Sequence, residues 1–240
     1  MDQTTPYCGP APLPADLWRA WNFDPPLLIA LGLFGAALIL LAQHRVAGAI
    51  AWGALVVAFV SPLCALTVAL FSARSAHHLL LVTVAAPALA YALPLWRRGP
   101  PVAALAMLTA AMVAWNLPPV YDLMWQSDTV YWLLQLAMLL PAWAFWSAVL
   151  APNSTAEATF QRAVLVGGLA GVMGLIGEVL TFAPRILFFQ HVEGAALWGM
   201  GALADQQLAG LVMWVPGFLP VALIAFLMLR RGWRQGFAAP

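Results

Sequence analysis

Long apolar segments, separated by short polar junctions, make up most of this chain. A helix needs roughly 20 apolar residues to cross about 30 Å of hydrocarbon. Because the segments are continuously apolar rather than alternating, they indicate helices and not barrel strands. We therefore predict an all-α, polytopic membrane helix bundle. Its seven transmembrane helices are expected at about residues 26–43, 46–70, 77–96, 101–120, 130–150, 162–189 and 207–229.

The junctions between these segments are too short to hold a second domain. We expect residues 26–240 to form a single seven-helix domain, preceded by an N-terminal tail over residues 1–25. The tail is polar and rich in proline, and it lacks the basic start and apolar core of a cleavable signal peptide. We therefore expect it to be retained in the mature protein.

Composition agrees with this fold class. Hydrophobic residues make up 64% of the 240 and charged residues 8%, whereas a soluble domain carries about 25% charged residues. The mean hydropathy is +0.89. Such a chain cannot cover a water-facing surface, so it is expected to be an integral membrane protein in contact with lipid.

The arginines predict the orientation, since the chain has no lysine. Three arginines, Arg19, Arg74 and Arg185, belong to the side of the N-terminus. Seven belong to the side of the C-terminus: Arg45, Arg97, Arg98, Arg162, Arg230, Arg231 and Arg234. By the positive-inside rule the C-terminus is cytoplasmic and the N-terminus is outside. No basic face is dense enough for nucleic acid to be an expected partner.

Two adjacent histidines open the third predicted helix, at its outer end. Imidazole and sulfur are the soft ligands that suit Cu(I), so His77 and His78 are candidate metal ligands. Cys8 and Cys64 also lie in the outer half and could form a disulfide, although their spacing does not require one.

The alternative is a structural role for both histidines. Neighbouring residues point about 100° apart on a helix, so at most one of the pair faces a given site. No chelating spacing is present, and a histidine at a membrane boundary can simply be hydrated. We expect His78 to face the bundle near Asp205 and the Trp115–Asp122 segment, and His77 to be the wetter of the two.

A second polar cluster lies around the fourth and fifth helices. Pro118 and Pro119 are expected to break the helix near the outer surface. Asn116 and Gln135 lie deeper, where an unpaired amide is costly, so we expect hydrogen bonds between helices. The aromatic residues are expected to form an interfacial belt: Trp115, Tyr121, Trp125, Tyr131 and Trp132. The cluster either lines an outer cavity or anchors a helix hairpin.

The sixth predicted helix contains Glu178, an acid inside a span and therefore a functional candidate. Arg185 follows two turns later and is a possible partner, so a paired, structural glutamate is the competing interpretation. The glycines before it, Gly167, Gly171 and Gly174, are expected to allow close helix packing.

The last predicted helix opens with "LADQQLAGLVMWVPG". Asp205 is expected to cap the first turn of this helix, with Gln206 and Gln207 at the water boundary. Gly210 permits tight packing, and Pro216, after Met213 and Trp214, is expected to bend the helix.

Three segments now support a resemblance. "SARSAHHLLLVTVAAP", "WNLPPVYD" and "LADQQLAGLVMWVPG" resemble hallmark segments of the membrane-integral CtaG family of cytochrome c oxidase assembly factors, and "YCGPAP" and "SPLCAL" resemble lesser features of it. The resemblance extends over nearly the whole chain. It implies a seven-helix protein of the bacterial cytoplasmic (plasma) membrane, a chaperone-like factor that helps to make active haem-copper oxidase in the respiratory chain. Its implied partners are the oxidase subunits, its implied cargo is copper, and no enzymatic activity is expected.

The resemblance also carries over to single residues. His78 matches the family histidine of the third helix, and Asp205 and Gln206 match its DQ motif. Trp115, Pro118, Tyr121 and Asp122 match the aromatic segment. Many relatives have histidine where this chain has Asn116, Tyr131 and Gln135. Copper is therefore expected at His77 or His78 with outer-face sulfur, or the role does not involve metal.

Three functions follow, in order of preference. The first is an assembly factor that aids copper delivery to, or maturation of, the oxidase from the periplasmic side. The second is a non-catalytic accessory subunit or stabilising partner of a respiratory oxidase. The third, a transporter or enzyme that uses Glu178 and His78 for proton transfer, ranks last because familiar catalytic motifs are missing.

Overall fold

The structure, a computed structural model, describes residues 6–152 and 155–237. Within these ranges the regular elements are all helical, and residues 1–5 of the predicted tail lie outside them. The longer helices are α1 (Pro25–Leu41), α2 (Arg45–Phe59), α3 (Pro62–Ala69), α4 (Phe71–Leu79), α5 (Ala86–Ala92), α6 (Pro101–Trp115), α7 (Pro118–Gln126), α8 (Asp128–Val149), α9 (Ala156–Phe182), α11 (Ala202–Val212) and α12 (Leu219–Phe237). The shorter elements are η1 (Pro14–Arg19), η2 (Leu80–Ala85), η3 (Phe189–His191), α10 (Val192–Leu197) and η4 (Met213–Phe218).

Four helical rods are long and apolar enough to cross a membrane, and the number rises to six if each of two bent pairs is one span. The described residues confirm the predicted all-helical fold, and these rods are consistent with a membrane protein. The remaining predicted span, α1, is apolar but only 17 residues long, so the structure does not confirm a seventh crossing.

Proline sets the two breaks in the bent pairs. The predicted helix over 46–70 is wrong as a single helix, because Ser61 and Pro62 divide it into α2 and α3, which are bent by 45°. Proline starts a helix readily but disfavours its continuation, since it has no backbone N–H to donate to the preceding turn. The predicted break at Pro118 is confirmed, and it separates α6 from α7 by a bend of 78°.

Other prolines are absorbed without a break: Pro141 lies inside α8, and two more lie at π-helices. The six-residue π-helices η2 and η4 lie beside Pro87 and around Pro216. Wider π-turns commonly accommodate a residue that cannot make the regular helical hydrogen bond. α4, η2 and α5 therefore form one rod, and so do α11, η4 and α12. The second rod is continuous from Ala202 to Arg234, so Pro216, which was expected to bend the helix, does not break it.

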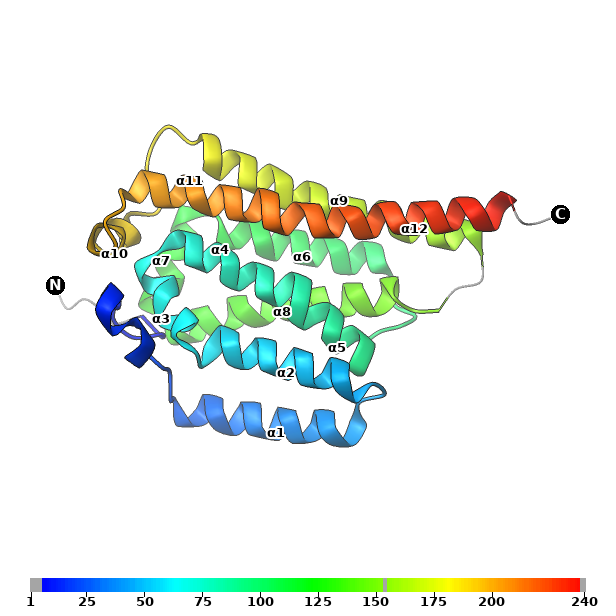
Figure 1. The fold of residues 1–240 in the computed structure, drawn as a ribbon, viewed down its shortest axis with the longest axis horizontal. Coiled ribbons are helices and arrows are strands. Elements are labelled where there is room, and N and C mark those ends of the chain that lie inside the picture. Colours follow the sequence, from blue (N-terminus) through cyan, green and yellow to red (C-terminus); the bar gives the residue numbers. More distant parts are fainter. Residues whose placement is uncertain (1–5, 153–154, 238–240) are drawn as a thin grey trace.

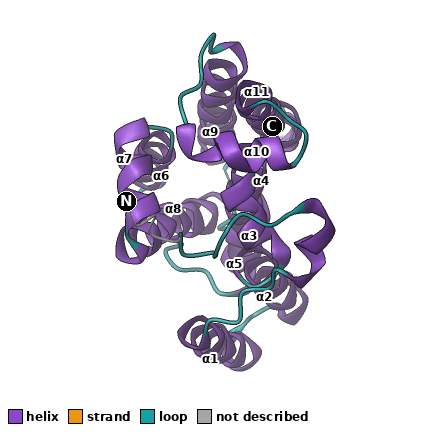
Figure 2. Ribbon diagram, turned by 90° about the vertical axis from the view of Figure 1, so that its left-hand side faces the viewer, coloured by secondary structure: helices purple, strands orange, loops and turns teal. Residues whose placement is uncertain are grey.

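The rods are packed side by side, and the two termini lie at opposite ends of the long axis (Figure 1). In the end view, α4 occupies the middle of the bundle and α1 lies at its edge (Figure 2). We call the end that holds α3, α7 and α10 the disulfide end. The opposite end, which holds Arg45, Arg97, Arg98, Arg162 and the start of α9, is called the arginine end.

Cys8 and Cys64 form a disulfide that joins the N-terminal segment to α3, with their Cα atoms 5.4 Å apart. The indole of Trp198, just after α10, also donates to the Pro12 carbonyl at 3.0 Å, and the Tyr7 hydroxyl donates to Asp24 at 2.7 Å. The described part of the segment before α1 is therefore fastened to the bundle.

α9 and α11 approach each other closely at Gly210, which was predicted, and at Gly177, which was not. A Cβ atom on Gly177 would lie 2.8 Å from the Gly210 carbonyl oxygen, and one on Gly210 would lie 2.5 Å from the Gly177 oxygen. Gly171, by contrast, has no neighbouring heavy atom within 4 Å of such a Cβ. The predicted role of Gly210 is confirmed, whereas Gly171 does not contribute to this contact.

Candidate functional site

The N-terminus of α4 is capped by a carboxylate from another helix. The backbone N–H groups of Phe71 and Ser72 donate to Asp205 at 2.6 and 3.1 Å, and the Ser72 hydroxyl donates to it at 2.5 Å. Helix N-termini favour anionic acceptors because their first N–H groups have no partner within the helix. The prediction that Asp205 caps its own helix is wrong, since that position belongs to Gly201, which makes no side-chain bond.

The next residue, Gln206, fastens the loop that follows α9. Its amide oxygen accepts from the Leu187 N–H at 2.7 Å, and its amide nitrogen donates to the Arg185 carbonyl at 3.2 Å. Gln206 is buried, which contradicts the expected place at the water boundary, whereas Gln207 is half-buried. The Asp-Gln pair therefore joins α11 to α4 and to the 183–188 loop.

Arg74 lies at the centre of the polar cluster that follows this cap, with only 2% of its surface exposed. Its guanidinium lies over the rings of Trp115 and Tyr131, at 5.6 and 5.8 Å, and donates to the Thr67 carbonyl at 3.3 Å. Its Nε and Nη1 atoms lack a hydrogen-bond partner among the described residues. From the sequence, Arg74 was expected only as a charge at the outer side. Its place within a polar run of α4, "SARSAHH", was the signal for a buried role.

Both histidines of α4 are buried, so the expectation that His77 is the wetter is wrong: His77 is 0% and His78 5% exposed. The His78 ring lies 4.5 Å from that of Trp115, as expected, and the His77 ring lies 5.2 Å from that of Phe59. Within the described part of the chain, three imidazole nitrogens, Nδ1 and Nε2 of His77 and Nε2 of His78, lack a hydrogen-bond partner.

A third histidine closes the cluster at the disulfide end and was not recognised from the sequence. The His191 Nε2 atom and the Tyr121 hydroxyl are 2.7 Å apart, and both residues are buried. Burial, reinforced by the positive charge of Arg74, lowers the pKa of His191 to about 3. The ring is therefore neutral at physiological pH.

The other predicted polar and aromatic residues divide into two groups. Trp115, Tyr121 and Tyr131 are buried, so they belong to the cluster and not to an interfacial belt. Gln135 is also buried, but its amide has no hydrogen-bond partner. The Asn116 amide donates to the Met112 carbonyl of its own helix at 2.8 Å. The interhelical hydrogen bonds expected of these two amides are absent from the described residues.

Several remaining candidates lie outside the cluster. Asp122 is exposed and accepts a hydrogen bond from Gln190. Glu178 and Arg185 are both exposed, and among the described residues no ion pair joins them, so their predicted pairing is not found. Met213 is buried, and Trp214 packs edge-on against Phe182 with 6.1 Å between ring centroids.

The family model of the cytochrome c oxidase caa3 assembly factors matches residues 98–235, which is more than half of the chain. The chain belongs to this family of assembly factors. No curated protein and no solved structure matches it. Membership indicates a non-catalytic role and association with components of cytochrome c oxidase.

The part that matches the assembly-factor family runs from the start of α6 into α12. It includes Trp115, Tyr121, Asp205 and Gln206 but begins after Arg74 and the paired histidines. The resemblance expected over nearly the whole chain is therefore shown for residues 98–235 only. In this assembly factor, matched residues such as Asp205 nevertheless hold the unmatched α4 directly.

Metal-binding side chains are sparse in this assembly factor. The described residues contain no group of three or more His, Cys, Asp or Glu residues that could hold a metal ion. The sulfurs of Cys8 and Cys64 are bonded to each other and cannot serve as thiolate ligands. A closed metal centre of the usual kind is therefore not formed by these residues, and copper binding would depend on the histidines of α4.

Proposed function

We propose that this chain assists the maturation of cytochrome c oxidase from outside the bacterial cytoplasmic membrane, and that His77 and His78 handle copper as a cargo. The observation that carries the copper role is the set of three buried imidazole nitrogens of His77 and His78 that lack a hydrogen-bond partner among the described residues. A buried polar atom without a partner is costly and calls for an explanation. Neutral imidazole is a common copper ligand, so a transiently bound copper ion would supply one.

Two independent features support an outer location for this site. A disulfide persists in oxidising compartments such as the periplasm, and the Cys8–Cys64 bond lies at the same end as the cluster. The arginines that favour the cytoplasm gather at the opposite end, among them Arg45, Arg97 and Arg98. Both features support an outer location for the proposed copper-handling end.

The composition of the cluster favours transfer over storage. Arg74 carries a positive charge beside the histidines, and Coulomb repulsion would weaken the binding of a cation. Among the described residues no third His, Cys, Asp or Glu side chain completes a ligand set with His77 and His78. Copper held in this way would exchange readily, which is what delivery to an oxidase subunit requires.

Copper loading of the purified protein tests the proposal. The protein is loaded with Cu(I) under reducing conditions beside a His77→Ala/His78→Ala variant, and bound copper is measured after removal of excess metal. His44→Ala is the matched control, because His44 is exposed at the arginine end and stacks on Tyr91. We expect near-stoichiometric copper in the parent and control proteins and its loss in the double variant.

A second function is favoured by the missing third ligand and by the charge of Arg74. In it the chain is a non-catalytic accessory subunit or stabilising partner that works by contact with haem-copper oxidase subunits. The absence of copper from both the parent and the double variant would support this function over the first. Co-purification separates them further, since a lasting partner is recovered in stoichiometric amounts and a transient factor is not.

A further inference from the structure

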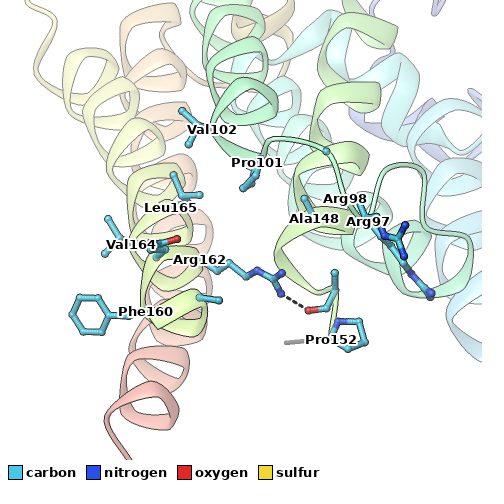
Figure 3. Close-up of a pocket in the computed structure, with 14 residues that line it drawn as sticks. Arg97, Arg98, Pro101, Val102, Ala148, Pro152, Phe160, Arg162, Val164 and Leu165 are labelled. Carbon is cyan, nitrogen blue, oxygen red and sulfur yellow. Dashed lines mark hydrogen bonds between the residues drawn. The ribbon is translucent and has the colours of Figure 1, made fainter. Parts of the chain in front are cut away.

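A cavity of about 860 Å³ opens at the arginine end, away from the histidine cluster. Its wall is formed by the junction before α6, the end of α8 and the first turns of α9 (Figure 3). A cavity of this size is large enough for a small molecule or for part of a lipid. Because it shares no residue with the cluster, its role is independent of the proposed function.

Three arginines line this cavity, and none of the described residues that line it is acidic. Arg162 extends from α9 toward the end of α8, where it donates to the Ala151 carbonyl (Figure 3). Arg97 donates to the amide oxygen of Gln43, and Arg98 lies beside it. Within residues 6–152 and 155–237 none of the three forms an ion pair. The cavity therefore concentrates positive charge that no carboxylate of this described part neutralises.

The rest of the lining is apolar and partly open to the surroundings. Val102 on α6 and Phe160 and Val164 on α9 have about half or more of their surface exposed (62, 48 and 57%). These side chains lie on helices that belong to candidate membrane spans, so their exposed surface faces lipid. A charged rim beside an apolar wall fits a ligand with an anionic head and a hydrocarbon chain.

We propose that this cavity binds an anionic glycerophospholipid, with the headgroup phosphate on Arg97, Arg98 and Arg162. The acyl chains would lie along Val102 and Val164. The planar guanidinium group matches the oxygens of a phosphate with paired hydrogen bonds. Basic pockets between transmembrane helices on the cytoplasmic side are a known way of holding anionic headgroups. A soluble phosphate would use the same arginines but would gain nothing from the apolar wall.

Native mass spectrometry of the full chain in detergent tests this proposal. The protein is titrated in turn with phosphatidylglycerol, cardiolipin and the zwitterionic phosphatidylcholine. We expect the two anionic lipids to bind at least about tenfold more tightly than phosphatidylcholine. An Arg97→Gln/Arg98→Gln/Arg162→Gln variant should lose this preference, and equal binding of all three lipids to the parent protein would overturn the proposal.

A matched triple variant controls for the loss of charge. Arg230→Gln/Arg231→Gln/Arg234→Gln removes three exposed arginines from α12 at the same end, outside the cavity. It should retain the lipid preference of the parent, and an equal loss in both triple variants would show non-specific attraction and contradict a site. The single Arg98→Gln variant changes an exposed residue, so it is expected to fold and should weaken binding several-fold.

The apolar wall distinguishes a lipid from a free anion. Val102→Ser/Val164→Ser should weaken phosphatidylglycerol binding about tenfold, since both valines would lose their apolar contact with the acyl chains of the bound lipid. Inorganic phosphate in millimolar excess should displace little of the bound lipid. Complete displacement by phosphate, together with unchanged lipid binding in the serine variant, would reduce the site to a phosphate site and overturn the lipid proposal.

Discussion

Asp205 on α11 accepts the backbone N–H of Phe71 at 2.6 Å, across 134 positions of the sequence. A second oxygen of the same carboxylate accepts from Ser72, so one buried side chain fixes the start of the central helix α4. Because Arg74, His77 and His78 all lie on α4, this contact also positions the polar cluster. A residue inside the part that matches the family model thus fixes the start of α4, which lies outside that part.

Removal of this carboxylate should destabilise the protein. Asp205→Ala leaves three donors of Phe71 and Ser72 buried without an acceptor, and we expect a loss of about 2–4 kcal/mol. Asp205→Asn retains the shape but not the charge and should cost less. Thermal unfolding in detergent measures the effect. The exposed Asp128 provides a control, and a loss as large in Asp128→Asn would contradict a specific cap.

The sequence is informative where structure depends on neighbouring residues and much less where it depends on distant ones. Hydropathy locates the helices, and Pro118 locates a break, because both effects act within a few residues. The cap on α4 is different. An aspartate near the start of a helix looks the same whether it caps its own turn or another helix, and only the packed bundle decides between them.

The same limit applies to the cluster itself. Arg74, His191 and Gln206 are polar residues near predicted helix ends, and from sequence alone such residues are expected at the membrane surface. Burial of all three follows from the way α4 is enclosed by α11 and by the loops of the disulfide end. The pairing of Tyr121 with His191 joins positions 70 apart and has no local signal.

Reduction of the Cys8–Cys64 disulfide should lower stability. The bond closes a loop with a sequence separation of 56 residues, for which chain entropy gives about 4 kcal/mol. We expect a lower unfolding temperature after treatment with dithiothreitol. A Cys8→Ser/Cys64→Ser variant should unfold at this lower temperature with or without the reductant. Equal unfolding temperatures for the oxidised and reduced parent protein would show that the bond does not form.

Acid should destabilise the protein in part through His191. Its pKa is lowered to about 3 in the folded protein by burial and by Arg74, against about 6.5 when unfolded. Above pH 6.5 both states are neutral and the stability is fully present. As the pH falls from 6.5 toward 3, His191 becomes protonated in the unfolded state but stays neutral in the folded state. The free energy of unfolding therefore falls by up to about 1.4 kcal/mol per pH unit.

The comparison of two proteins isolates this contribution. Unfolding of the parent protein and of His191→Gln is followed from pH 7.5 to 4.5, and the parent should lose stability more steeply. Glutamine retains a hydrogen-bonding group opposite Tyr121 but does not titrate. Identical slopes for the two proteins would show that His191 is protonated equally in both states, in conflict with its burial.

The contact between α9 and α11 should not tolerate a methyl group. Alanine at Gly177 would place its Cβ 2.8 Å from the Gly210 oxygen, and the helices would have to separate. We expect Gly177→Ala to cost about 1–3 kcal/mol, as overpacking does elsewhere. Gly171→Ala, on the same helix but with open space around it, should be neutral or slightly stabilising because alanine favours helix.

Since Asp205 and Gln206 share α11 with Gly210, the Gly177 variant should also loosen the polar cluster. Faster hydrogen exchange at the Phe71 and Ser72 amides would report that change, and unchanged exchange would show that the cap holds independently of this helix contact.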